Sequence, residues 1–185
     1  MRTFISLNLD DRARRAVKKY KELLKKAISE EEQSKIKWET EDKYHITLFF
    51  LGDVKDAMKR LINEKIDEIS NLNIGKIDFE FERISAFPNL KNPRLIYLDV
   101  LDKEKKSFAL SEAVDDYMNF LGFEKDKKYV PHITLGRVRR DKRLHLNDIN
   151  IECENEKFTV NGVSLMKSTL TFKGSIYEEL HRVEL

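Results

Sequence analysis

The chain has 185 residues, of which 41% are hydrophobic and 10% aromatic, with 6 Gly and 3 Pro. This length and composition are typical of a folded globular protein with its own core, and they exclude a disordered chain or a multidomain machine. Lysine plus arginine number 35 against 33 aspartate plus glutamate, a formal charge of +2, which permits a nucleic-acid partner without arguing for one.

The cysteine content and the start of the chain bear on location. Cys153 is the single cysteine, so the sequence offers neither an internal disulfide nor a cysteine zinc-ligand spacing, as is usual in a reducing compartment. The first nine residues lack the long apolar stretch of a signal peptide or a membrane span. We therefore expect a cytoplasmic protein that does not enter a membrane.

The amino-terminal part of the chain alternates strand and helix patterns. Residues 2–9 alternate side chains with the period of a strand. Asp10 and Asp11 can begin a helix, and apolar residues recur at helical spacing over residues 13–28. The other elements expected here are a polar loop over residues 30–34 and strands near residues 36–39 and 44–51.

The rest of the chain continues this pattern. The expected elements are a helix over residues 57–69, a strand over 77–81, a turn-rich connection over 88–93, a strand over 94–101, a helix over 105–121, a strand over 130–138, and strands near 157–166 and 176–185. A unit of strand, helix and histidine-bearing strand thus occurs twice. His45 follows Thr3 by 42 residues, and His132 follows Arg94 by 38.

This internal repeat predicts the fold class. We expect an α+β fold with two pseudo-symmetric lobes, each with a mainly antiparallel sheet and helices on its outer face, and with the active site in the central cleft. The chain has no polar linker long enough to separate the lobes. We therefore predict one bilobal domain over residues 1–185.

The repeated units share the tetrapeptide His-Ile-Thr-Leu, at His45 to Leu48 and at His132 to Leu135. With this composition, a given histidine is followed by Ile-Thr-Leu by chance only about once in three thousand cases. Because side chains alternate along a strand, each histidine and its threonine share one face while the isoleucine and leucine anchor the other. The two strands together would present two imidazoles and two hydroxyls to one space.

Two imidazoles and two hydroxyls suit a tetrahedral phosphate. Hydrolysis of a cyclic phosphodiester needs a base that activates water and an acid that protonates the leaving oxygen, on opposite sides of phosphorus. Histidine titrates near neutral pH and can fill either role. The hydroxyls of Thr47 and Thr134 would donate hydrogen bonds to the non-bridging oxygens. The candidate catalytic residues are therefore His45, Thr47, His132 and Thr134, with no metal and no cofactor.

Two other interpretations compete with this one. Histidine and threonine can simply occupy polar positions of half-buried strands, although the duplication of the whole tetrapeptide argues against that. A zinc site is the second alternative, because two strand histidines can bind a metal. However, the position two residues after each histidine is threonine, which is a poor zinc ligand.

Several other residues are candidates for a place in or near the site. Strict alternation places Arg137 on the face opposite His132, so contact with a substrate phosphate or base would need a bulge near Gly136. Phe49, Phe50 and Tyr177 can stack a base or belong to the core. The basic residues that follow can contact RNA or form a solvated face: Arg139, Arg140, Lys142 and Arg143. Two further histidines, His145 and His181, lack such a context and are left outside the site.

On these motifs the chain resembles the two-histidine phosphoesterase superfamily, and within it the RNA 2′,3′-cyclic phosphodiesterases once described as 2′-5′ RNA ligases. The matching segments are Arg2-Thr3-Phe4-Ile5, His45 to Gly52, Pro93 to Tyr97, Pro131 to Arg137, and Lys167 to Thr171 followed by Gly174 and Tyr177. The tail departs from the family pattern, which often has prolines around the glycine where this chain has Phe172 and Ser175.

The resemblance implies cleavage of a 2′,3′-cyclic phosphate to a 2′-phosphate, with His45 as the proton donor and His132 as the proton acceptor. On sequence alone the pseudo-symmetry leaves these two roles interchangeable. RNA ends or cyclic nucleotides would be the substrate of a monomer without an obligate protein partner. Alternative functions are 2′-5′ RNA ligation at the same site, a non-catalytic RNA-binding module, and action on an ADP-ribose cyclic phosphate.

Overall fold

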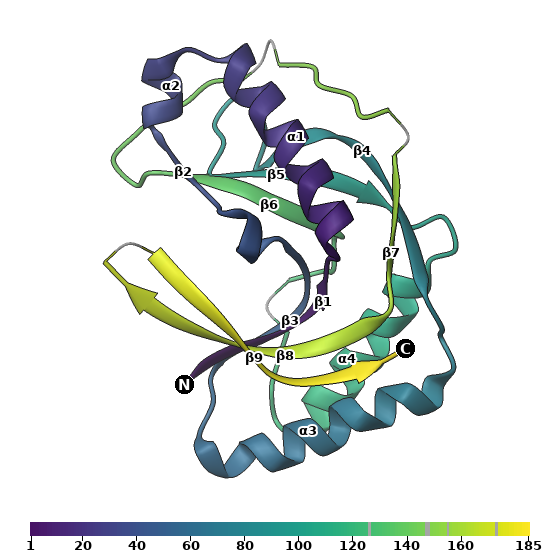
Figure 1. Ribbon diagram of the computed structural model, residues 1–185. Helices are drawn as coiled ribbons and strands as arrows, with labels where there is room; N and C mark the ends of the chain where they lie inside the picture. The colour runs from purple at the N-terminus through teal and green to yellow at the C-terminus, as the bar shows by residue number, and fades with distance from the viewer. Residues whose placement is uncertain (126, 147–148, 155, 173) are drawn as a thin grey trace.

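We describe the fold from a computed structural model of the chain, which covers residues 1–125, 127–146, 149–154, 156–172 and 174–185 (Figure 1). The strands are β1 (Arg2–Asn8), β2 (Ile36–Trp38), β3 (His45–Asp53), β4 (Ile77–Phe87), β5 (Leu95–Leu101), β6 (His132–Val138), β7 (Lys157–Val160), β8 (Gly162–Thr171) and β9 (Gly174–Glu184). The α-helices are α1 (Asp11–Ala27), α2 (Glu30–Ser34), α3 (Lys59–Asp67) and α4 (Lys106–Phe120). Short 3-10 helices are η1 (Glu41–Lys43), η2 (Asp56–Met58) and η3 (Glu68–Leu72).

The described strands form one curved antiparallel sheet in the order β7-β4-β5-β6-β3-β1-β8-β9, with β2 also paired to β6 (Figure 1). The order is symmetric about its centre, where β3 and β6 pair through Ile46 and Ile133. We call β3, β1, β8 and β9 the His45 lobe, and β6, β5, β4, β7 and β2 the His132 lobe. The structure thus confirms the predicted α+β fold with two pseudo-symmetric antiparallel lobes.

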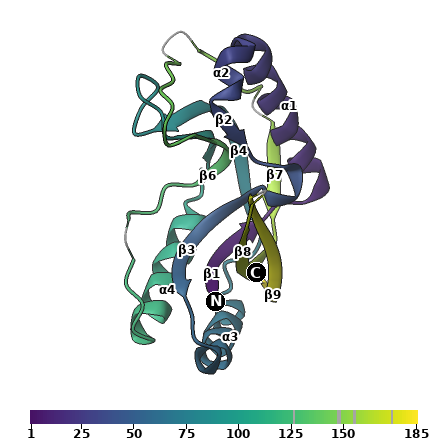
Figure 2. The same ribbon diagram turned by 90° about the vertical axis from the view of Figure 1, so that its left-hand side faces the viewer.

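The connecting helices are exchanged between the lobes. Helix α1 belongs to the connection between β1 and β3 of the His45 lobe, which also contains α2, β2 and η1, but it packs against β6. Helix α4 joins β5 to β6 of the His132 lobe but packs against β3. Helix α3 packs against β8 and β9. In Figures 1 and 2, α1 lies against one lobe while α3 and α4 lie together against the other. This exchange ties the two lobes together.

The strands that carry the histidines anchor themselves through their apolar residues. Ile46, Leu48, Ile133 and Leu135 are fully or almost fully buried in one core cluster with residues of α1, α3 and α4. The face of each strand opposite the helices is left for the histidine and the threonine. The predicted division of each tetrapeptide into an anchoring face and an open face is therefore confirmed.

Two predictions of local structure were wrong. Residues 30–34 form α2 and not a loop, because the Ser29 hydroxyl accepts from the Glu32 amide while the Glu32 carboxylate accepts from the Ser29 amide, a capping box that stabilises one helical turn. The expected strand near residues 157–166 is two strands, β7 and β8, which separate at Asn161 and join opposite lobes.

Candidate active site

The two His-x-Thr pairs face the same boundary between the lobes. In β3 and in β6, the histidine and threonine are half-buried, while the isoleucine between them is fully buried. Since Ile46 and Ile133 pair at the seam, the two histidine residues that precede them lie on neighbouring strands that run in opposite directions. The structure therefore brings together His45, Thr47, His132 and Thr134.

Both imidazoles are held by the same backbone contact. His45 Nδ1 lies 2.7 Å from the carbonyl oxygen of Lys43, and His132 Nδ1 lies 2.7 Å from that of Val130. A carbonyl oxygen only accepts, so Nδ1 must donate its hydrogen in both cases. The Nε2 atom of each histidine is consequently the one left to take up or release a proton.

The surroundings of the two Nε2 atoms differ. His45 Nε2 lies 3.0 Å from the hydroxyl oxygen of Thr47, whereas the described structure has no corresponding bond between His132 and Thr134. In the neutral form of His45, the Thr47 hydroxyl donates to Nε2; in the protonated form, Nε2 donates to that hydroxyl. Thr47 therefore contacts a histidine in the free site, while the hydroxyl of Thr134 is not committed to one.

Aromatic rings enclose each imidazole. The ring centroids of Phe4 and Tyr177 lie 4.9 and 5.5 Å from that of His45. Those of Tyr97 and Phe87 lie 5.1 and 5.4 Å from that of His132. Tyr177 was one of the candidates from the sequence, whereas the other three rings were missed. Alternation along their strands was the available signal, but aromatic residues in strands more often belong to the core alone.

Burial and positive charge disfavour the protonated form of both histidines. Burial lowers the pKa of His45 from 6.5 to about 4; the Lys43 carbonyl partly offsets this, and the charges of His132 and Arg137 lower it further. Burial is also the largest cause of the lowered pKa of His132, again with a contribution from Arg137. A negatively charged ligand between the imidazoles would act in the opposite direction and favour protonation.

A bulge brings Arg137 to the histidine face. Ile96 pairs with Gly136 and Tyr97 with Thr134, so Leu135 is an extra residue without a partner on β5. Leu135 and Gly136 are consequently both buried, and Arg137 is exposed on the side of His132. Its charge acts on both imidazoles. The bulge required for a role of Arg137 in the site is present.

The other histidine strand has the same irregularity. Ile5 pairs with Phe49 and Ser6 with Thr47, which leaves Leu48 as the extra residue. Phe49 is then buried, 1% exposed, so the hypothesis that it stacks a base is wrong. Phe50 instead is 60% exposed and takes the position in β3 that Arg137 takes in β6. It remains a candidate for base stacking.

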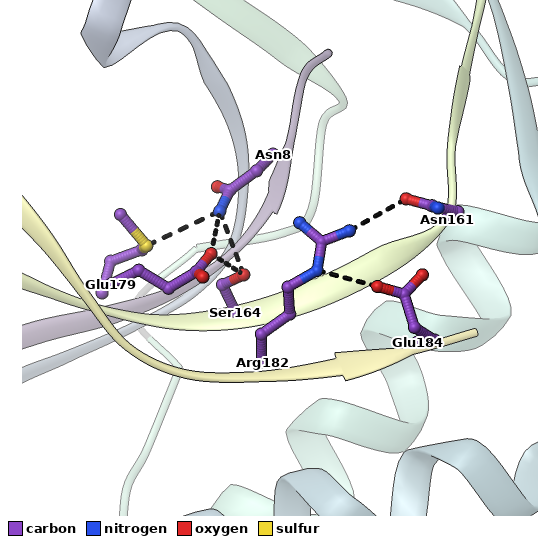
Figure 3. Close-up of polar contacts among 7 residues, drawn as sticks. Asn8, Asn161, Ser164, Glu179, Arg182 and Glu184 are labelled. Carbon is purple, nitrogen blue, oxygen red and sulfur yellow. Dashed lines mark hydrogen bonds and ion pairs between the residues drawn. The ribbon is translucent and has the colours of Figure 1, made fainter.

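A polar network supports the strand beside His45. Asn8 pairs with His45 across β1 and β3, and its side-chain amide donates to Ser164 Oγ at 3.0 Å and to Glu179 Oε2 at 2.9 Å (Figure 3). Ser164 donates to the same carboxylate at 2.7 Å. These bonds tie β1, β8 and β9 together beside the site. The equivalent residue in the other lobe is Asp99, which pairs with His132.

The remaining candidates lie outside this constellation. His145 Nδ1 is bonded to the carbonyl of Lys91, and His181 Nε2 lies 2.6 Å from Asp67 Oδ1. In the basic segment, Arg139 donates to the carbonyl of Ser34, while Lys142 pairs with Asp141. Its other members, Arg140 and Arg143, are exposed. Contact of this segment with RNA stays a prediction.

Neither a cluster of metal ligands nor a membrane-spanning helix occurs among the residues that the structure describes. Within the described ranges, no three His, Cys, Asp or Glu side chains gather in a way that would hold a metal ion. No helix in the part of the chain that the structure describes has both the length and the apolar character needed to cross a membrane.

The fold and the site together define a class of protein: two antiparallel lobes, each contributing one His-x-Thr strand to a shared face, as in two-histidine phosphoesterases. The sequence profile of the LigT-like phosphoesterase family matches residues 10–97 and 101–177. The chain belongs to this family.

Relatives of known name agree with this assignment. A protein of Archaeoglobus fulgidus named RNA 2′,3′-cyclic phosphodiesterase is 33% identical over 100% of both chains. A protein of the same name from Methanocaldococcus jannaschii is 31% identical over 96% of this chain and 97% of its own. The likeness extends over essentially the full length of each protein.

Solved structures share the fold. The protein TT0787 of Thermus thermophilus superposes with a TM-score of 0.83 at 21% identity, covering 100% of this chain and 98% of the other. Escherichia coli LigT in complex with 3′-AMP gives a TM-score of 0.81 at 18% identity, covering 100% and 97%. At these identities the likeness establishes the fold.

Proposed function

We propose that the protein hydrolyses 2′,3′-cyclic phosphates at RNA ends or on nucleotides, to leave a 2′-phosphomonoester. The observation that carries the proposal is the matched pair of imidazoles, each with Nδ1–H committed to a backbone carbonyl and Nε2 available for proton transfer. The names of the relatives support the same substrate, and the 3′-AMP bound to Escherichia coli LigT supports a nucleotide ligand.

The reaction needs simultaneous proton transfers at two places. In the proposed scheme, His132 Nε2 takes a proton from water as its oxygen forms a bond to phosphorus. The bond from phosphorus to the 3′-oxygen breaks, and protonated His45 donates its Nε2 proton to that oxygen. The phosphate stays on the 2′-oxygen, and the net change is the addition of one water molecule.

The other site residues stabilise charge on the phosphate. The hydroxyls of Thr47 and Thr134 donate hydrogen bonds to its non-bridging oxygens, where such bonds are strengthened by charge. The guanidinium of Arg137 compensates the negative charge. The bound phosphate also raises the pKa of the nearby imidazoles, so that His45 takes up from solvent the proton that it lacks in the free site.

The product identifies the reaction. Purified protein is incubated in EDTA with a short RNA ending in a 2′,3′-cyclic phosphate, with and without a second RNA that carries a 5′-hydroxyl. We expect a 2′-phosphate and no longer RNA. A 3′-phosphate would contradict the proposed leaving group, a joined RNA would identify ligation, and an unchanged substrate would favour a binding module.

A substrate with a sulfur leaving group tests which histidine is the acid and which is the base. In a cyclic substrate whose 3′-oxygen is replaced by sulfur, the departing thiolate needs little protonation. We expect His45→Ala to lose much less activity on this substrate than on the oxygen substrate, whereas His132→Ala should be impaired on both. The opposite result would exchange the two roles.

We also infer that the protein acts as a cytoplasmic monomer without an obligate protein partner. In support, one chain supplies all proposed catalytic residues, and Cys153 is a lone cysteine whose pKa burial raises to about 12, as expected for a structural thiol. Light scattering during gel filtration should give a mass near 21.9 kDa. A mass of twice that value would contradict the monomer.

A further inference from the structure

Two positive side chains stand opposite each other on β2 and on β6, the strand that carries His132. Lys37 on β2 pairs with Arg137 on β6, so both project from the same face of the sheet. Ile36 and Trp38, on either side of Lys37, point toward the core instead. Like charges directly across two strands destabilise a sheet. Repulsion between the exposed side chains of Lys37 and Arg137 therefore destabilises the pairing of β2 with β6.

The surrounding charges do not neutralise the pair. Glu39, 17% exposed, lies 3.9 Å from Arg137 and 4.0 Å from Lys43, so its single carboxylate is shared between two cations. In the part of the chain that the structure describes, Lys37 forms no ion pair. Its ammonium lies beside Gly174 in the β8–β9 hairpin, where a Cβ atom would be 3.2 Å from it, and Lys43 lies on the same side.

The position of this charge relates it to the site. Arg137 acts electrostatically on both histidines, and Lys37 extends the positive surface from Arg137 toward the hairpin. An RNA that ends in a cyclic phosphate carries one further phosphodiester for each additional nucleotide, whereas a cyclic mononucleotide carries none. A second anion beside the first would relieve the repulsion between Lys37 and Arg137.

We propose that Lys37, which lies beside Arg137, binds the phosphodiester on the 5′ side of the terminal nucleotide. The inference rests on the proposed function and adds a binding residue and the preference that follows from it, for RNA ends of at least two nucleotides over cyclic mononucleotides. Lys37 is a binding residue in this scheme and takes no part in proton transfer. A lysine suits the task because phosphate binding there requires a point charge and no base readout.

The proposal is tested by removing the charge of the internal phosphodiester in a dinucleotide substrate. Two dinucleotides ending in a 2′,3′-cyclic phosphate are compared, one with a natural internal phosphodiester and one with an uncharged methylphosphonate. We expect the wild-type protein to prefer the charged dinucleotide by about three- to tenfold in kcat/KM, the scale of a partly exposed ionic contact. In Lys37→Gln the preference should fall toward one.

A matched control separates this contact from general electrostatics. Lys76 is an exposed lysine just before β4, two strands from the histidine strand of its lobe. Lys76→Gln removes the same charge and should keep the wild-type preference. If both variants lost the preference for the charged dinucleotide equally, the net charge of the protein would explain the preference, and the proposed contact with Lys37 would be wrong.

The two proposals fail in different ways. If neither dinucleotide nor a cyclic mononucleotide is hydrolysed, the proposed function itself is wrong. If wild-type protein hydrolyses both dinucleotides equally well, the function stands and the second phosphate site is wrong. The comparison of the two dinucleotides with wild-type protein therefore tests the second phosphate site even if Lys37→Gln folds poorly.

Discussion

The two histidine strands of this protein are copies that differ where the chemistry needs them to differ. Both contain His-Ile-Thr-Leu, both hold Nδ1 on a backbone carbonyl, and both bulge at the leucine. Five residues after the histidine, however, β3 presents Phe50 and β6 presents Arg137. In the proposed mechanism an acid and a base act in opposite directions at once, and the difference between Phe50 and Arg137 makes the surroundings of the two histidines unequal.

We expect the largest effect on activity from the removal of one of the two site histidines. His45→Ala or His132→Ala should lower kcat/KM by about two to four orders of magnitude, because each removes a general acid or base. Single-turnover hydrolysis of a cyclic phosphate measures the loss. The control is His145→Ala, which removes an exposed imidazole outside the site and should leave activity unchanged. Wild-type activity in either site variant would refute the two-histidine mechanism.

The next effect concerns the residue that makes the halves unequal. Arg137→Gln should lower kcat/KM by about tenfold, since an exposed charged contact with phosphate is lost. Removal of the positive charge favours protonated imidazole, so the lowered pKa values of His45 and His132 should rise toward 6.5.

The pH profile distinguishes that role of Arg137 from a structural one. The profile of kcat/KM reports the free enzyme and requires one neutral and one protonated histidine. The optimum of Arg137→Gln should therefore lie at higher pH than that of the wild type. Arg60→Gln, on an exposed residue of α3, provides the control. An optimum that moves to lower pH would contradict the charge argument.

The threonines allow a finer comparison of the halves. Thr47→Ala and Thr134→Ala should each lower transition-state stabilisation by about 1 to 3 kcal/mol, the scale of a hydrogen bond to a charged group. Thr47→Ser and Thr134→Ser keep the hydroxyl, so these variants should retain most of the wild-type activity. If the alanine and serine variants were equally active, the hydroxyl would not contact the reacting phosphate. Steady-state kinetics at one pH gives the kcat/KM values for this comparison.

The last prediction concerns stability and the close packing around Gly136, next to the bulge in the His132 lobe. A Cβ atom on Gly136 would lie 2.7 Å from Ile36 Cγ2 and 3.1 Å from the carbonyl oxygen of Lys37. Gly136→Ala should therefore destabilise the fold by about 1 to 3 kcal/mol, measured by thermal or denaturant unfolding. Adding Ile36→Ala removes the nearest atom, so the double variant should be less destabilised than the sum of the two single variants. Strict additivity would contradict the clash.

The sequence alone carried much of the site. Side-chain alternation was enough to place His45 with Thr47 and His132 with Thr134 on open faces, because the adjacent isoleucine and leucine residues must be buried. The repeated unit of strand, helix and histidine-bearing strand also predicted the two-lobed sheet. By contrast, Phe49 and Phe50 are adjacent and both aromatic, and the sequence could not distinguish the buried ring from the exposed one.

The residues that complete the site come from distant parts of the chain. Phe4, Phe87 and Tyr97 have no local motif, and they reach the histidines only through the arrangement of the strands. Lys37 likewise reaches Arg137 only through the pairing of β2 with β6. Sequence periodicity describes one strand at a time. It therefore cannot report which strand lies next to which, or which residues face each other across the pair.

The sequence by itself determined which chemical groups the two histidine strands expose, since the residue types and the period of two fix them. Only the tertiary structure decided how those groups become unequal. The bulges at Leu48 and Leu135 depend on register with β1 and β5, and they bring Phe50 and Arg137 to the histidine face. The juxtaposition of Lys37 with Arg137 likewise depends on the pairing of β2 with β6, which is a long-range contact that no local pattern encodes.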